Sequence, residues 1–125
     1  MDYKLLLDSV VMAGEIMLRR GAETWRVEDT MLRMLRMSKL KTAQVFAMTT
    51  GFTVTLDDPS MDSLTVVRRI ETRSMNLERV DQINQISRNF CCGDLTVEEM
   101  FRAVKKIYRE PGDRKAHLPG YMILT

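Results

Sequence analysis

The hydrophobic pattern of this chain changes its period twice along the sequence. Apolar residues recur at helical spacing up to about residue 38, alternate with polar residues from Gln44 to Ile70, and return to helical spacing after Asn76. A chain with this pattern can be neither all helix nor all strand. It predicts an α+β fold, in which a small antiparallel three-stranded sheet is flanked by an N-terminal helical hairpin and two C-terminal helices, in the order ααβββαα.

Two helices are expected before the sheet. The first covers residues 3–20 and is expected to end at Gly21, which can adopt the left-handed conformation that closes a helix. The polar side of this helix, expected to lie opposite its apolar face, carries Lys4, Asp8, Glu15 and Arg19. The second helix is expected to begin at Thr24, whose hydroxyl can cap free backbone amides, and to run toward Ser38. The short connection between the helices predicts a hairpin.

Three strands are expected next, over residues 45–49, 52–56 and 64–70. The second shows the clearest alternation, with apolar Phe52, Val54 and Leu56 separated by Thr53 and Thr55. Gly51 is expected at a tight turn or bulge, where the absence of a Cβ avoids strain. Because short loops join the strands, the sheet is expected to be an antiparallel meander.

Two further helices complete the expected fold. Asn76 is expected to cap the first, which ends at Gly93. Thr96 and Glu99 have the spacing of a capping box at the start of the second, which stops before Pro111. Both helices present apolar residues at helical spacing, so they are expected to pack on the rest of the domain.

Length and composition indicate one domain. The chain has 125 residues, of which 45% are hydrophobic and 29% charged, as in ordinary globular proteins. No apolar run approaches the roughly 20 residues that cross a bilayer. The first apolar run is broken at Asp8 and is followed by no small-residue cleavage site, so no secretory signal is expected. A cytoplasmic location is the expectation.

Metal and cofactor chemistry have few candidate residues. Cys91 and Cys92 are adjacent, which disfavours a disulfide between them. His117 is the only histidine, so a Cys/His metal site, or a histidine-activated nucleophile, would depend on this one residue. We therefore expect no metal site, no cofactor and no catalytic residue.

The positive charge of the chain is concentrated near its C-terminal end. Between residues 102 and 117, six Lys and Arg residues stand against two acidic residues. Such a segment can contact nucleic acid or an anionic membrane surface, or can simply form a solvated helix face. Nucleic acid is not expected as a partner, because only Tyr108 supplies an aromatic ring in the segment and no nucleic-acid-binding motif accompanies it.

Several polar residues exceed what the fold requires. Arg68 and Arg69 point to opposite faces of one strand, so at least one of them needs a carboxylate or a bound anion as partner. Together with Arg68, the residues of a candidate substrate-binding site are Glu23, Arg26, Glu28, Arg73, Asn76, Asn84 and Arg88. Ordinary helix capping explains the acidic residues equally, and an exposed helix face explains Asn84 and Arg88.

An ordered set of short motifs gives this chain a family resemblance. The motifs are Gly21-Ala22-Glu23-Thr24-x-Arg26-Val27-Glu28, Thr50-Gly51, Arg68-Arg69-Ile70, Asn76-Leu77-Glu78-Arg79, Asn84 with Ser87-Arg88, and Leu95-Thr96-x-Glu98-Glu99. In this order they resemble the N-terminal soluble domain of the putative threonine/serine exporter family. The resemblance extends from about Leu5 to Ile107.

The resemblance implies a place beside a membrane transporter. In that family the domain precedes a bundle of transmembrane helices, and members are associated with the export of threonine, serine or dicarboxylates. Residues 1–110 are then expected to be a single α+β domain at the cytoplasmic face of the cell membrane, and residues 111–125 a tail that leads toward an absent membrane region. The basic segment agrees with this, because cytoplasmic flanks of membrane helices are rich in Lys and Arg.

Three functions follow from the resemblance as expectations. The favoured one is an accessory domain that binds a small amino acid or dicarboxylate, or gates its access to a transmembrane region in the same chain or a partner chain. The second is a hydrolase-like activity, with Glu23 or Glu28 as general base and Thr50 as nucleophile. The third is a purely structural or oligomerisation module of the exporter, which includes a homo-oligomer.

Overall fold

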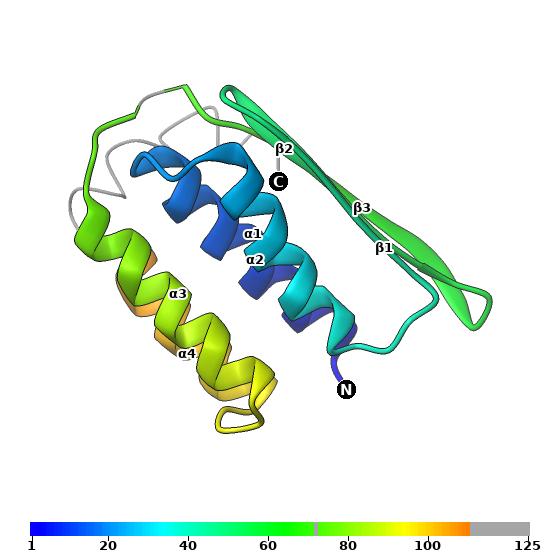
Figure 1. Ribbon diagram of the computed structural model, residues 1–125. Coiled ribbons are helices and arrows are strands. Elements are labelled where there is room, and N and C mark those ends of the chain that lie inside the picture. Colours follow the sequence, from blue (N-terminus) through cyan, green and yellow to red (C-terminus); the bar gives the residue numbers. More distant parts are fainter. Residues whose placement is uncertain (72, 111–125) are drawn as a thin grey trace.

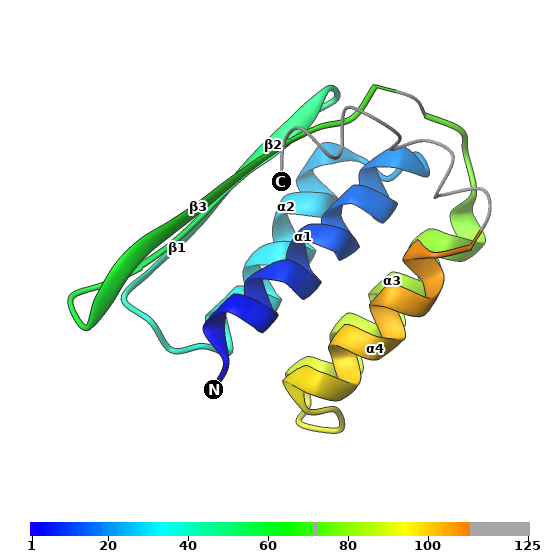
Figure 2. The same ribbon diagram turned by 180° about the vertical axis from the view of Figure 1, so that it is seen from behind.

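The computed structural model describes residues 1–71 and 73–110 and has three layers. A three-stranded sheet forms one outer layer, α1 and α2 form the middle layer, and α3 and α4 form the other outer layer (Figure 1; Figure 2 shows the reverse side). The elements are α1 (Tyr3–Arg19), α2 (Thr24–Arg36), β1 (Thr42–Met48), β2 (Gly51–Asp58), β3 (Met61–Arg69), α3 (Leu77–Cys91) and α4 (Val97–Tyr108). This order confirms the predicted α+β fold and its ααβββαα arrangement. The expected tail over residues 111–125, with His117, lies outside the described residues.

Helix α1 is the central element of the domain. Asp2 caps its N-terminus by accepting a hydrogen bond from the Leu5 amide. Gly21 has the expected left-handed conformation, with a φ of 98°, and the Ala22 amide donates back to the Met17 carbonyl at 2.9 Å. Every residue from 9 to 20 is buried, because α1 lies between the sheet and α4.

One sequence expectation for α1 is wrong. The helical pattern places Glu15 and Arg19 on a polar side facing solvent, but they are 1% and 3% exposed. The expectation assumes that only one side of the helix is covered. Helix α1 is instead covered by the sheet on one side and by α4 on the other. Only Lys4 and Asp8, at the N-terminal end, reach the surface in the expected way.

Helix α2 begins at Thr24, as predicted, but Thr24 is not its cap. Its N-cap is Glu23, whose side chain makes no capping hydrogen bond, and Thr24 is the first residue inside the helix. The prediction that the Thr24 hydroxyl caps the helix is therefore wrong. The helix still forms the expected hairpin with α1, through Val27, Met31, Met34 and Leu35, which are fully buried.

The sheet is an antiparallel meander in the order β1-β2-β3. Phe52, Val54 and Leu56 face the helices and are buried, as their alternation predicts. The strands extend beyond the predicted ranges, since β1 begins at Thr42 and β3 at Met61. Gly51 directly follows the two-residue turn of the first hairpin, and its position shows why glycine is required: an added Cβ would meet the Arg68 carbonyl oxygen.

The C-terminal hairpin follows the predicted caps. Asn76 accepts a hydrogen bond from the Arg79 amide at the start of α3, and Gly93 ends that helix with a φ of 87°. Thr96 and Glu99 form the predicted capping box of α4, with reciprocal hydrogen bonds of 3.1 and 2.8 Å. These caps fix where α4 begins, and hence that Tyr108 lies in its last turn.

Candidate functional site in the core

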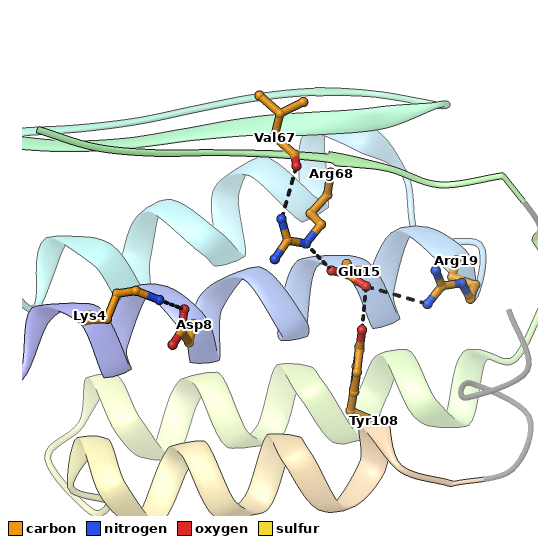
Figure 3. Close-up of polar contacts among 7 residues, drawn as sticks. All are labelled: Lys4, Asp8, Glu15, Arg19, Val67, Arg68 and Tyr108. Atoms are coloured by element: carbon orange, nitrogen blue, oxygen red, sulfur yellow. Dashed lines mark hydrogen bonds and ion pairs between the residues drawn. The ribbon is translucent and has the colours of Figure 1, made fainter. Parts of the chain in front are cut away.

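A polar cluster lies in the core where the three layers meet. It consists of Glu15 and Arg19 from α1, Arg68 from β3 and Tyr108 from α4, and we call it the Glu15 cluster. In Figure 3 the side chains of Arg19, Arg68 and Tyr108 converge on the Glu15 carboxylate. All four residues are less than a tenth exposed.

The Glu15 carboxylate receives a partner from each outer layer. Arg68 Nε donates to Oε1 at 2.8 Å, and the Tyr108 hydroxyl donates to Oε2 at 3.0 Å. Both bonds are direct and of ordinary length for a carboxylate. One buried side chain therefore links the sheet to α4 through the middle layer.

Arg68 reaches this position because β3 turns its side chain inward near the end of the strand. Its register partner on β2 is Phe52, which also faces the core. A second donor of the guanidinium, Nη1, points back toward the strand and donates to the Val67 carbonyl at 3.2 Å (Figure 3). The expectation that one of the two neighbouring arginines needs a carboxylate is confirmed, and that arginine is Arg68.

Arg19 is the member of the cluster whose hydrogen bonding is incomplete. It is 3% exposed, and its Nε and Nη1 have no hydrogen-bond partner among residues 1–71 and 73–110. Nη1 lies 3.9 Å from Glu15 Oε2, which is an ion-pair distance and not a hydrogen bond. A buried guanidinium with unused donors is costly, and proteins rarely keep one without a reason.

The pKa of Glu15 is raised above its usual value of 4.5, because burial penalises the charged carboxylate. The hydrogen bond from Tyr108 and the charges of Arg68 and Arg19 act in the opposite direction, and burial prevails. With Glu15 ionised, the cluster holds two cations against one anion. Among the described residues, the cluster then carries a net charge of +1.

An open groove leads toward the Glu15 cluster. It has a volume of about 440 Å³ and lies between the first turns of α1 and strand β3. Arg68 lines it, and so do Lys4 and Asp8, which form an ion pair of 2.8 Å. Asp8 and Glu15 are seven positions apart, which is about two helical turns, so they lie on the same face of α1 (Figure 3).

Sequence reasoning finds only Arg68 of these four residues. It misses Glu15 and Arg19 because it places them on the polar side of the helix, and it assigns Tyr108 no role in a site. One signal could have found Glu15, since it is the single charged residue in the apolar stretch from Ser9 to Leu18. A lone carboxylate inside such a stretch is typical of a helix that is covered on all sides.

The acidic residues of the predicted site lie near the start of α2. Glu23 is exposed and accepts a hydrogen bond from the Trp25 indole at 3.0 Å, while the Arg26 guanidinium lies 5.2 Å from the Trp25 ring centroid. Glu28 accepts a hydrogen bond from the Ala47 amide at 2.7 Å and so ties α2 to β1.

The other predicted site residues have separate local roles. Arg73 is exposed and donates to the Thr49 carbonyl, and Asn76 is the cap of α3. Asn84 accepts from the Thr30 hydroxyl at a long 3.5 Å, and Arg88 is exposed and donates to Gln85. Among the described residues, no two of the eight predicted site residues share a hydrogen bond or an ion pair. Ligand binding by these eight residues stays a prediction.

The residues named for hydrolysis also make separate local contacts. Thr50 lies in the turn between β1 and β2, where its carbonyl accepts a hydrogen bond from the Ile70 amide. The Glu23 and Glu28 carboxylates bind Trp25 and Ala47, as described above, and neither has a hydrogen bond to Thr50 within the described part of the chain. Residues 1–71 and 73–110 contain no group of three His, Cys, Asp or Glu side chains that could hold a metal ion.

Comparison with known proteins places the chain in a family. Within residues 1–71 and 73–110, no helix is both long and apolar enough to span a bilayer. No curated protein and no solved structure matches the sequence. The model of the putative threonine/serine exporter family, in contrast, matches residues 8–124, which is nearly the whole chain. The chain therefore belongs to the putative threonine/serine exporter family.

Proposed function

We propose that this domain is an accessory part of an exporter, placed at the cytoplasmic face of the membrane, and that it binds a small carboxylate-bearing metabolite. The ligand would be an amino acid or a dicarboxylate. Its binding would gate access to the transmembrane region, which belongs to the same chain or to a partner chain. The binding position that we propose is the Glu15 cluster.

The observation that carries the proposal is the incomplete hydrogen bonding of Arg19. Its Nε and Nη1 are buried donors without acceptors in the described part of the chain, and a carboxylate oxygen is the acceptor that a guanidinium binds best. Glu15 Oε2 lies 3.9 Å from the same Nη1 and could accept a hydrogen bond from an ammonium group. An α-amino acid carries both a carboxylate and an ammonium group, and a dicarboxylate carries two carboxylates.

The groove beside β3 supports a route to this position. Arg68 lines the groove and also binds Glu15, so a carboxylate that enters the groove meets Arg68 before it reaches Arg19. Competition between the ligand and Glu15 for Arg68 would loosen the contact between α1 and β3. Because Tyr108 of α4 binds the same carboxylate, the change would also reach the opposite layer. Such a shift between layers is a physical basis for gating.

Calorimetric titration of the 125-residue chain with threonine, serine and succinate tests the proposal. We expect saturable heat from at least one of the three in the millimolar range, and loss of that heat in Arg19→Met. Arg33→Met is the matched control, because Arg33 is an exposed arginine that pairs with Asp29 on the surface of α2. If a folded domain gives no heat with any of the three ligands, the proposal is overturned.

The stability of Arg19→Met separates a binding site from a structural lock. In a binding site, the buried guanidinium is maintained for its ligand, so its replacement by an apolar side chain of similar length should leave the ligand-free domain equally stable or more stable. In a lock, the same substitution should lower the melting temperature. Thermal unfolding without ligand provides this measurement, and a clear loss of stability would favour the structural module.

A further inference from the structure

The face of the sheet that points away from the helices carries three exposed apolar side chains toward one end. Each strand alternates, so the outward residues form four rows across β1, β2 and β3. The rows are Met48-Gly51-Arg69, Phe46-Thr53-Val67, Gln44-Thr55-Thr65 and Thr42-Asp57-Ser63. We call this surface the outer sheet face. Phe46, Met48 and Val67 are 65%, 51% and 54% exposed on it.

The two charges on the outer sheet face lie at its opposite ends. Arg69 is in the first row and Asp57 in the last, where Asp57 accepts a hydrogen bond from the Ser63 hydroxyl at 2.8 Å. The two inner rows carry no charged side chain. A surface that is positive at one end, negative at the other and uncharged between them is complementary to a reversed copy of itself.

We infer that the outer sheet face is a homodimer interface in which two sheets stack with their strand directions reversed. The two-fold axis lies between the sheets and runs across the strands, midway between the second and third rows. This axis places Arg69 of each protomer over the Asp57 end of its partner. The contact is isologous, so each charge pair occurs twice.

A hollow at the edge of the face fits the same arrangement. It has a volume of about 390 Å³, is lined on the outer face by Gln44, Phe46, Thr53 and Thr55, and extends past β1 to α2. The proposed axis sets the Phe46 ring of one protomer over Gln44 of the other, at this hollow. The projecting Phe46 ring and the hollow thus lie on the same face, and the two-fold axis brings the ring of each protomer to the hollow of its partner. Aromatic side chains seated in such hollows commonly dominate binding energy.

The proposed interface is small and mixed in polarity, because threonines surround the apolar residues. Interfaces below about 1,200 Å² are typical of weak association, so we expect a dissociation constant in the micromolar range. The inference is independent of carboxylate binding at the Glu15 cluster, which lies on the other side of the sheet.

Sedimentation velocity of the 125-residue chain over a range of concentrations tests the inference. We expect a monomer–dimer equilibrium that Phe46→Lys and Val67→Lys abolish. Leu77→Lys is the matched control, because Leu77 is 57% exposed on α3, outside the outer sheet face, and should leave dimerisation unchanged. Circular dichroism verifies that each variant is folded. A wild-type chain that stays monomeric at high micromolar concentration overturns the inference.

A charge-reversal cycle tests the arrangement itself. Arg69→Glu or Asp57→Lys alone should weaken the dimer roughly tenfold, because each reversal turns two ion pairs into repulsions. The double variant Arg69→Glu/Asp57→Lys should recover most of that loss. Recovery is expected only if the two residues meet across the interface. If the double variant loses as much dimer affinity as the two single variants lose together, the reversed stacking is overturned.

Discussion

Glu15 and Arg68 lie 53 positions apart in the sequence and meet in the core, where Arg68 Nε donates to Glu15 Oε1 at 2.8 Å. Glu15 is 1% exposed and Arg68 is 8% exposed, so water contributes little to the solvation of either charge. Their interaction fixes strand β3 on helix α1. The same carboxylate binds Tyr108, so the pair also determines how α4 is held.

Removal of Arg68 should destabilise the domain strongly. Arg68→Met leaves the Glu15 carboxylate buried without its main hydrogen-bond donor, and loss of one member of a buried pair costs about 3–5 kcal/mol in the free energy of unfolding. Urea denaturation followed by circular dichroism measures this quantity. The double variant Glu15→Gln/Arg68→Met should lose less than the two single losses added together, since it leaves no unpaired charge. A loss below about 1 kcal/mol for Arg68→Met would contradict the role assigned to the pair.

The stability of the domain should depend on the protonation of Glu15. Because burial raises its pKa in the folded state above the usual 4.5, the folded protein binds the proton more tightly than the unfolded chain does. The contribution of Glu15 to stability is therefore fully present below pH 4.5 and is lost as the pH rises through the raised pKa. Glu15→Gln cannot titrate, so it removes this dependence.

Urea denaturation of the wild type and Glu15→Gln at a series of pH values isolates the effect. The difference in unfolding free energy, wild type minus variant, should increase as the pH falls from neutral toward 4.5. Other carboxylates titrate in both proteins and cancel in the difference. A difference that stays constant over this range would show that the folded-state pKa of Glu15 is not raised.

The sequence predictions that the structure confirms rest on local interactions. The capping box of Thr96 and Glu99 needs residues only three positions apart, and the alternation in β2 shows one face of one strand. Signals of this kind are present in the segment itself. The predicted cap of α2, Thr24, is one residue too late, because both Glu23 and Thr24 precede the apolar pattern and the sequence does not choose between them.

The Glu15 cluster could not be predicted in the same way. Its members come from α1, β3 and α4, and the bond from Tyr108 to Glu15 joins residues 93 positions apart. Helical periodicity tells which residues share a face, but not how many faces are covered. Since α1 is covered by the sheet on one side and by α4 on the other, the polar side of the helix became part of the core.

Gly51 should tolerate alanine poorly. Its φ is 155°, and an added Cβ would clash with the Arg68 carbonyl oxygen, so β2 and β3 would have to separate where Arg68 enters the core. We expect Gly51→Ala to lower the free energy of unfolding by about 1–3 kcal/mol. Gly93 provides a comparison, because its φ is 87° and a Cβ added there would have no heavy atom within 4 Å. Gly93→Ala should cost only the free energy of placing a non-glycine residue at a positive φ, about 1 kcal/mol. Chemical denaturation of both variants shows whether the contact with the Arg68 carbonyl oxygen makes the loss larger at position 51.

The two threonines at helix starts should differ in their contribution to stability. The Thr96 hydroxyl accepts a hydrogen bond from the Glu99 amide at 3.1 Å, so Thr96→Ala should cost about 1 kcal/mol of unfolding free energy. Thr24 lies inside α2 and is not its cap, so Thr24→Ala should change that free energy by less than about 0.5 kcal/mol. The substitution is chemically the same at both positions, so the comparison isolates the capping bond. Equal losses in thermal or urea denaturation would mean that the hydroxyl of Thr96 adds no stability through its cap.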